Sequence, residues 1–370
     1  MHNNNLSNRE CKEEIKLVNR IFISVFVTAY KRKQFLIEAV KSVLSQTLSR
    51  EFFEIIVAKS FMDTKTDEFL LKNDLISLYI DDDRYGYRFS KALEISKGNI
   101  VVTLDDDDIF LPSFLERLYN LFSLYTDVGA YQKSLTYFEA SEKYYIRKDV
   151  PSLDAIKRSN FIYDLGKRED FNLSISLNAS YGQLVIKKDL LLPYLNYVQN
   201  VKTSLDGALF AIAALEKCKV FYDSEAYVLV RVHENSESML TAKALDDTFF
   251  RNKITSIIKL LCDHSLFIEM SRRYNNKMLK QAIMQSKNYA LFQIIMASDD
   301  INISKIVSIT LERLKIAALN LNSDPIKALG GIFVYSYFFM LHIINKYQGR
   351  KIFFERSIHK FKKLMIPIEK

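Results

Sequence analysis

Four consecutive aspartates, residues 105–108, stand between two apolar segments in the stretch VVTLDDDDIFLP. Carboxylates this close in sequence repel one another when all are ionised, so the run favours a site that meets a positive charge. A carboxylate pair on a loop is a typical ligand set for Mg²⁺ or Mn²⁺. In an extended chain Asp105 and Asp107 project to one side, and Asp106 and Asp108 point elsewhere. We therefore expect Asp105 and Asp107 to bind one divalent ion together; a solvated acidic turn is the alternative.

The segments around this run predict the elements that hold it. Residues 21–28, IFISVFVT, are an apolar run typical of a buried strand, and residues 34–47 place apolar side chains at helical spacing. The same strand-then-helix order recurs in residues 52–72, 76–98 and 100–125. Apolar strands that alternate with amphipathic helices predict an α/β fold, with a mostly parallel sheet and helices on both faces.

In such a sheet, ligands bind in the crevice beyond the carboxyl ends of the strands. Tyr30, Lys59, residues 81–84 and residues 105–108 all follow predicted strands, so we expect them at this edge. The chain has neither a GxGxxG fingerprint nor a GxxxxGK[ST] phosphate loop. If a nucleotide binds, a metal must therefore hold much of its phosphate charge.

The composition is that of a globular protein. The 370 residues are 49% hydrophobic, which is enough for one large domain or two ordinary ones. The 3 cysteines form no CxxC pair, so neither a zinc site nor a disulfide framework is indicated, and a reducing cytoplasm is favoured. Residues 1–20 are polar and lack the apolar centre of a signal peptide, so we expect no export.

The net charge of +8 is unevenly distributed. Residues 241–370 hold 21 Lys and Arg against 10 Asp and Glu, whereas residues 1–240 hold 31 against 34. This shift predicts a boundary near residue 240. It also predicts an anionic neighbour for the rear of the chain, either a membrane surface or a nucleic acid.

Three stretches resemble, in order, the motifs of family 2 glycosyltransferases. Residues 23–47, ISVFVTAYKRKQFLIEAVKSVLSQT, resemble the family's opening strand and helix, and residues 96–112, SKGNIVVTLDDDDIFLP, resemble its Asp-x-Asp segment. Residues 204–238 resemble its third block, in which an acidic residue opens a helix and Arg-x-His-x-x-Ser follows. The resemblance spans residues 20–240. It implies the GT-A fold, a Rossmann-like mostly parallel sheet, and an inverting, metal-dependent transfer of sugar from a nucleotide-sugar to a hydroxyl.

The resemblance also implies roles for individual residues. The residues that would bind the nucleotide-sugar are Thr28, Ala29, Tyr30, Arg84, Asp105 and Asp106. Those that would hold Mn²⁺ or Mg²⁺ are Asp105, Asp107 and His233. On the acceptor side we expect Asn178, Gly182 and Gln183. Asp206 matches the catalytic base, which takes a proton from the acceptor hydroxyl.

Each of these positions also has a structural interpretation. Residues 28–30 can be ordinary strand-end packing, and Arg84 can be a surface arginine. Asp206 can cap a helix, a role that is compatible with that of a base. His233 can be structural, but Arg231 beside it favours function. Residues 81–83 form another acidic run, for which a solvated turn is favoured.

One segment departs from the family pattern. Where the family commonly reads Val-Asp-Asp-Gly-Ser after its second strand, this chain reads IIVAKSFMD. Lys59 and Ser60 replace the acidic pair that usually recognises the base. The nucleotide of the donor is therefore open between UDP and GDP types.

We predict a polar extension in residues 1–20, a GT-A domain in residues 21–240 and a helical region in residues 241–370. Residues 328–345 lack Asp, Glu, Lys and Arg, but their length is at the short limit for a membrane span. Residues 346–370 carry 8 basic and 2 acidic residues among apolar ones, as a helix on anionic lipid does. A buried helix with a solvated tail is the alternative. We expect a cytoplasmic protein, with attachment to the inner face of the cell membrane if the acceptor is lipid-linked.

Two other functions compete with sugar transfer to a glycan or lipid-linked acceptor. A nucleotidyltransferase also places acidic pairs at strand ends, but its glycine-rich basic signature near the N-terminus is missing. A non-enzymatic protein would bind nucleic acid or membrane through the basic rear segment. Its basic residues show no recognisable reading motif, so we expect no nucleic-acid partner.

Overall fold

The computed structural model describes residues 22–139, 160–171, 184–233, 246–297, 348–349 and 351–355. The predicted extension in residues 1–20, the acceptor-side residues Asn178, Gly182 and Gln183, and the apolar run in residues 328–345 lie outside this part of the chain. Among the helices that the structure describes, none combines the length and apolar character needed to cross a membrane.

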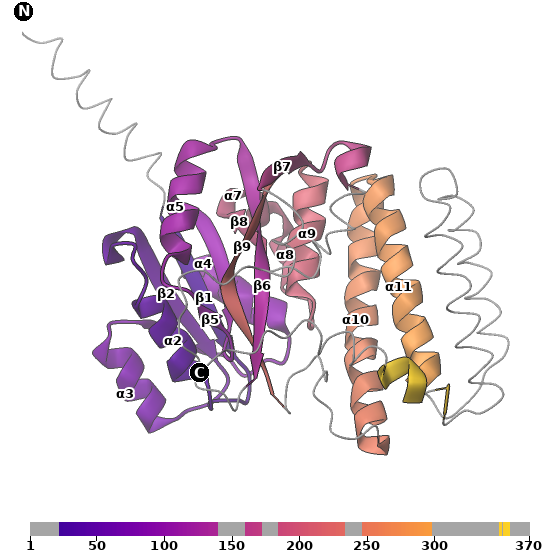
Figure 1. The fold of residues 1–370 in the computed structure, drawn as a ribbon, viewed down its shortest axis with the longest axis horizontal. Helices are drawn as coiled ribbons and strands as arrows, with labels where there is room; N and C mark the ends of the chain where they lie inside the picture. The colour runs from indigo at the N-terminus through magenta and orange to yellow at the C-terminus, as the bar shows by residue number, and fades with distance from the viewer. Residues whose placement is uncertain are drawn as a thin grey trace, which may run out of the picture.

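A nine-stranded sheet forms the centre of the described chain (Figure 1). Its first four strands pair in parallel in the order β3-β2-β1-β4. They are β1 (Ile23–Ala29), β2 (Phe53–Lys59), β3 (Ile76–Tyr79) and β4 (Ile100–Asp105). The predicted parallel sheet of an α/β fold is therefore confirmed for the segments that alternate with helices.

Beyond β4 the sheet becomes mixed. Its remaining strands are β5 (Ile109–Phe110), β6 (Val128–Glu139), β7 (Phe161–Asp164), β8 (Leu184–Lys187) and β9 (Lys219–Val232). β8 is antiparallel to both β4 and β6, β6 runs parallel to β9, and β5 and β7 are antiparallel to β9. The antiparallel pairs lie where the strand-then-helix repeat of the sequence has ended.

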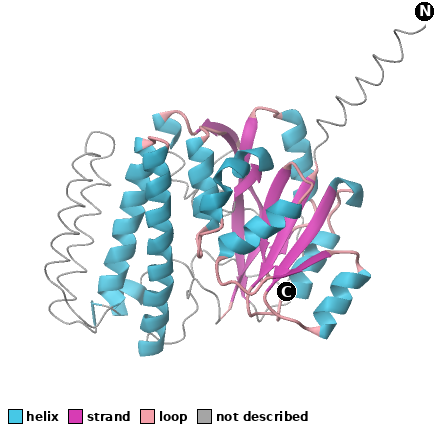
Figure 2. Cartoon of the chain, turned by 180° about the vertical axis from the view of Figure 1, so that it is seen from behind, coloured by secondary structure: helices cyan, strands magenta, loops and turns pink. Residues whose placement is uncertain are grey.

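Helices cover both faces of the sheet, as the sequence predicted (Figure 2). One buried cluster joins the sheet to α2 (Leu36–Leu44), α3 (Thr64–Lys72) and α5 (Phe114–Leu124). The other joins it to α4 (Tyr85–Ile95), α7 (Lys188–Leu191), α8 (Leu195–Val198) and α9 (Leu205–Leu215). Short 3₁₀ turns, η1 (Arg50–Phe52) and η2 (Leu192–Tyr194), precede β2 and α8.

Two long helices, α10 (Asp247–Arg273) and α11 (Lys277–Ala297), lie side by side beyond α9 (Figure 1). The buried cluster around α9 continues into them through Phe267, Met270 and Ile283. α9 is apolar on nearly all sides, which suits a helix enclosed between a sheet and another helix layer. The apolar core of the sheet is thus continuous with the first two helices of the rear region.

Candidate active site

The register of the parallel strands brings the predicted ligand-binding residues to one edge of the sheet. Ala29 pairs with Lys59, and Lys59 pairs with Tyr79. Thr28 pairs with Asp105 on the other side of β1. Because the four strands end at one level, the segments that follow them converge at the carboxyl edge, where α/β proteins bind ligands.

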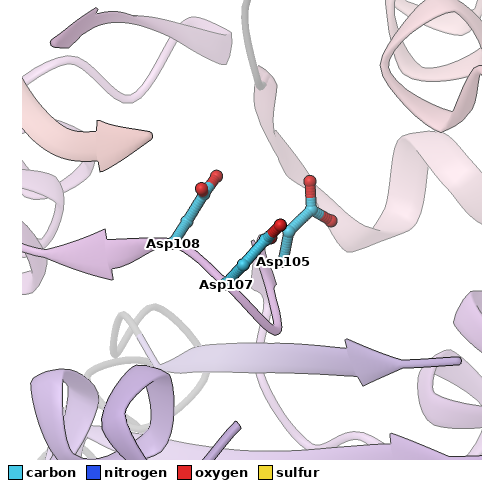
Figure 3. A group of neighbouring side chains, drawn as sticks. All are labelled: Asp105, Asp107 and Asp108. Atoms are coloured by element: carbon cyan, nitrogen blue, oxygen red, sulfur yellow. The ribbon is translucent and has the colours of Figure 1, made fainter. Parts of the chain in front are cut away.

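The acidic run turns at this edge. Asp105 ends β4, and residues 106–107 form the turn that leads to β5. The carboxylates of Asp105, Asp107 and Asp108 point to the same side of the turn (Figure 3). The prediction that Asp108 points elsewhere is wrong, because the alternation of side chains holds only while the chain stays extended.

The arrangement of the three carboxylates fits a divalent cation. One oxygen from each of Asp105, Asp107 and Asp108 lies within 4.8 Å of the others. Oxygen ligands of this kind suit Mg²⁺ or Mn²⁺. The predicted ligand His233 lies beside this group, with its Nε2 2.9 Å from Asp107 Oδ2. Asp108 also accepts a hydrogen bond from the backbone N–H of Arg231 at 3.0 Å, which fixes its orientation.

Arg32 is a cation in this site that sequence reasoning missed. Its Nη2 lies 2.6 Å from Asp106 Oδ1 and 2.7 Å from Asp107 Oδ2, and its Nη1 lies 3.1 Å from His233 Nε2. Burial lowers the pKa of this guanidinium, but the hydrogen bond and charge of Asp106 outweigh burial and raise it. Arg32 thus supplies a positive charge to the acidic run. The sequence feature that could have indicated this role is the position of Arg32, a basic residue two positions after Tyr30 at the end of the first strand.

Asp105 has an environment that favours its protonated form. Burial first, and then the charge of Asp107, raise the pKa of Asp105 to about 7. The Tyr85 hydroxyl donates a hydrogen bond to Asp105 Oδ1 at 2.5 Å, and this bond lowers the pKa of Asp105 and so opposes the effect of burial. Burial, followed by the charge of Asp105, raises the pKa of Tyr85 itself, so the phenol remains a donor. Asp105 therefore gains or loses a proton near neutral pH.

We expect Asp105→Asn to stabilise the chelator-treated protein near pH 8 but not near pH 4. The folded chain holds the Asp105 proton to about pH 7. The unfolded chain releases it near pH 4, so the free energy of unfolding falls as the pH rises between these values. One pKa unit is worth about 1.4 kcal/mol, so the gain near pH 8 is on the order of a few kcal/mol. Urea unfolding at both pH values measures it, and equal changes at both would contradict the prediction.

Asp206 lies in the first turn of α9. Its charge contributes to the raised pKa of Asp105 and of Tyr85, after burial and the nearer charges. The candidate base is therefore close enough to the candidate metal ligand Asp105 for their charges to interact, although it lies on a helix and Asp105 ends a strand.

Arg231 holds the acidic turn from the end of β9. It is buried, and its Nε donates to the carbonyl oxygen of Asp107 at 2.9 Å. Its Nη2 donates to Glu38 Oε2 at 2.6 Å, and its guanidinium stacks 4.4 Å from the ring centroid of Phe35. These contacts tie α2 to the turn, so Arg231 fixes the backbone that carries the carboxylates.

The predicted nucleotide-binding residues lie at the same edge. Thr28 and Ala29 are buried, and the guanidinium of Arg88 lies 4.9 Å from the ring centroid of Tyr30. Arg84 instead pairs with Asp82, at 2.6 Å between Nη2 and Oδ2. The hydrogen bond to Asp82 raises the pKa of Arg84 further. In this structure Arg84 is held at the start of α4 by its neighbour in sequence.

Lys59, which departs from the family pattern, is turned inward. It is 1% exposed, and its Nζ lies 2.7 Å from Asp67 Oδ1 and 2.8 Å from the carbonyl oxygen of Phe61. The hydrogen bond from Lys59 lowers the pKa of Asp67. Ser60 Oγ accepts a hydrogen bond from the backbone of Lys31 at 2.9 Å. Both replacements thus brace the loops after β1 and β2.

Comparison with known proteins agrees with the sequence motifs. Residues 24–189 match the model of the family described as Glycosyl transferase family 2. The match covers less than half of the chain, and it agrees with the transferase that the motifs predicted. Asp206 and His233 lie beyond the matched residues.

Individual relatives are distant. Over 324 residues the chain is 24% identical to an uncharacterized glycosyltransferase of Haemophilus influenzae, a match that covers 82% of this chain and 95% of the relative. Residues 1–349 of S. aureus TarS, solved with UDP, are 14% identical, with a TM-score of 0.48 and coverage of 88% of this chain and 92% of that one. The mannosyltransferase PcManGT from Pyrobaculum calidifontis, solved with GDP-Man and Mn²⁺, is 16% identical, with a TM-score of 0.46 and coverage of 85% of both chains.

Proposed function

We propose that this protein is a metal-dependent, inverting glycosyltransferase. It moves a sugar from a UDP- or GDP-type donor to a hydroxyl of a glycan or lipid-linked acceptor. The observation that carries the proposal is the convergence of three carboxylates with Asp206 in one site of a family 2 domain. The family match favours sugar transfer over nucleotidyl transfer.

The donor side of the site is built on the strand ends. Asp105 and Asp107 would hold Mn²⁺ or Mg²⁺, with Asp108 or His233 adjacent. When bound, such an ion neutralises the donor diphosphate and stabilises the leaving group. In this proposal the Tyr30 ring stacks on the nucleobase, and Thr28 and Ala29, which are buried, form the floor of the nucleotide site.

Asp206 would act on the acceptor. Its carboxylate takes the proton of the acceptor hydroxyl while the oxygen attacks the anomeric carbon. The bond from that carbon to the diphosphate oxygen breaks, and the nucleoside diphosphate leaves with the electron pair. Because attack and departure occur on opposite faces of the sugar, a single displacement inverts the anomeric centre.

The test is a calorimetric titration of the full chain with UDP-, GDP- and dTDP-sugars, with and without Mn²⁺. We expect one nucleotide class to bind, and to bind only with the metal. Slow release of nucleoside diphosphate, with water in place of the acceptor, then gives an activity assay that needs no acceptor. Folded protein that binds none of these donors with Mn²⁺ would overturn the proposal.

The organisation of the rear region is part of the same proposal. We keep the division near residue 240 and a cytoplasmic location. Attachment to the inner face of the membrane through residues 346–370 would suit a lipid-linked acceptor. Co-sedimentation of the full chain with anionic vesicles, compared with neutral ones, tests this attachment.

A further inference from the structure

α10 lies outside the residues that match the family, yet it reaches the loop in front of the candidate base. Asp263, on α10, is 1% exposed. It accepts three backbone hydrogen bonds from consecutive residues: Lys202 at 2.7 Å, Thr203 at 2.9 Å and Ser204 at 2.8 Å. A buried carboxylate is tolerated when several N–H groups compensate its charge, and bonds of this kind are stronger than neutral ones. Asp263 therefore fixes the backbone of residues 202–204.

The same loop also fixes the donor side of the site. The carbonyl oxygens of Val201 and Lys202 accept hydrogen bonds from Gly86 at 2.9 Å and Tyr85 at 3.1 Å. Tyr85 is the residue whose hydroxyl binds Asp105. A Cβ on Gly86 would overlap the carbonyl oxygen of Val198 at the end of α8 and lie 2.8 Å from Val201 Cβ, so the close approach of α4 to this segment requires glycine. The loop thus joins the start of α4 to the start of α9.

α9 contacts α10 near its first turn and the segment after α10 near its last turn. A Cβ on Gly207, next to Asp206, would meet Phe267 Cε2 at 3.1 Å, so the two helices are in close contact there. At the other end of α9, Asn276 donates a hydrogen bond from its Nδ2 to the carbonyl oxygen of Ala214 at 3.1 Å. α10 therefore contacts the first turn of α9, where Asp206 lies, whereas Asn276 contacts the far end of that helix.

We propose that Asp263 is a positioning residue for sugar transfer, which acts by holding residues 202–204 and thereby fixes Asp206 and Tyr85 relative to Asp105. This rests on the proposed function, because it takes Asp206 as the base. Removal of the carboxylate leaves three N–H groups of a part-buried loop without their acceptor, and the loop must move to satisfy them. A displacement of about 1 Å at a catalytic group can cost about 100-fold in rate. α10, which lies outside the residues that match the family, thereby supports the candidate site through Asp263.

The test compares three full-length variants. Asp263→Asn keeps the shape of the side chain but turns an NH₂ group toward N–H donors. Asp263→Glu keeps the charge and both acceptors but displaces them by one methylene. Asn276→Ala is the matched control, because it removes hydrogen bonds at the far end of α9 and at the start of α11, away from residues 202–204.

We expect Asp263→Asn to lower kcat for nucleoside diphosphate release about 30-fold, with the KM of the donor changed less than about threefold. Asp263→Glu should lower kcat about tenfold while its Tm stays closer to that of the wild type. Hydrogen exchange of amides 202–208 should accelerate about tenfold in Asp263→Asn, with β1 and β4 unchanged. Asn276→Ala should keep kcat within about twofold at a similar loss of Tm.

Two results would overturn the positioning role. One is a kcat in Asp263→Asn that falls no further than in Asn276→Ala at equal Tm. The other is unchanged exchange of amides 202–208. Failure of the proposed function is separate, since it shows in wild-type protein that binds no nucleotide-sugar, whereas the exchange experiment requires no substrate.

Discussion

Asp206→Asn is expected to lower the rate of sugar transfer about 1,000-fold, within the range that a general base contributes. The amide has nearly the same shape as the carboxylate but cannot accept the proton of the attacking hydroxyl. Asp206 lies outside the group of three carboxylates that fits a metal, so donor affinity with Mn²⁺ should change less than about threefold. Release of nucleoside diphosphate at saturating donor measures the first effect, and calorimetry measures the second.

The fold of the variant should be preserved. Asp206 occupies the first turn of α9, where a negative charge favours the helix by about 0.3 to 1 kcal/mol. The Asp206→Asn variant loses only this favourable interaction of the charge with the helix, so its Tm should fall by a few degrees at most. A kcat within about tenfold of wild type would exclude Asp206 as the base.

The sequence predicted the sheet edge because the information there is local. The apolar run at residues 21–28 corresponds to β1, and each following run of this type formed a strand of the parallel half. Parallel strands that end at one level bring their following loops together, so Tyr30, Lys59 and residues 105–108 were placed without knowledge of any side-chain contact.

The contacts that the sequence did not predict join residues far apart in the chain. Arg32 meets Asp106 and Asp107 across 74 and 75 positions, and nothing in the Tyr-Lys-Arg stretch distinguishes it from a surface cation. Asp263 accepts hydrogen bonds from the loop before α9, about 60 positions earlier in the sequence. The sequence of its own helix has an ordinary amphipathic pattern that does not single out this residue. Only the packing of α10 against α9 brings that carboxylate to the site.

Asp107→Asn is expected to abolish the metal dependence of donor binding, with a rise of about 100-fold or more in the Kd measured with Mn²⁺. Asp107 is the central carboxylate of the site. One of its oxygens belongs to the group that fits the cation, and its Oδ2 lies 2.7 Å from Arg32 Nη2 and 2.9 Å from His233 Nε2. Asparagine keeps one oxygen but removes the charge that attracts the ion. Calorimetry with the donor that the wild type selects, with and without Mn²⁺, measures the effect.

The matched control is Asp83→Asn, which removes one negative charge at the same edge of the sheet. Asp83 is half-exposed and lies 3.4 Å from Lys259 on α10, outside the group of carboxylates. If net charge alone governed donor binding, both variants would weaken it equally. If Asp107 ligates the ion, only Asp107→Asn will weaken it.

Loss of the Asp107 charge also removes a cause of the raised pKa of Asp105, so that pKa should fall below about 7. Asp105 would then ionise at less cost in the folded state, which offsets the lost pairing with Arg32 and keeps the variant folded. Full Mn²⁺-dependent binding by Asp107→Asn would place the metal site elsewhere.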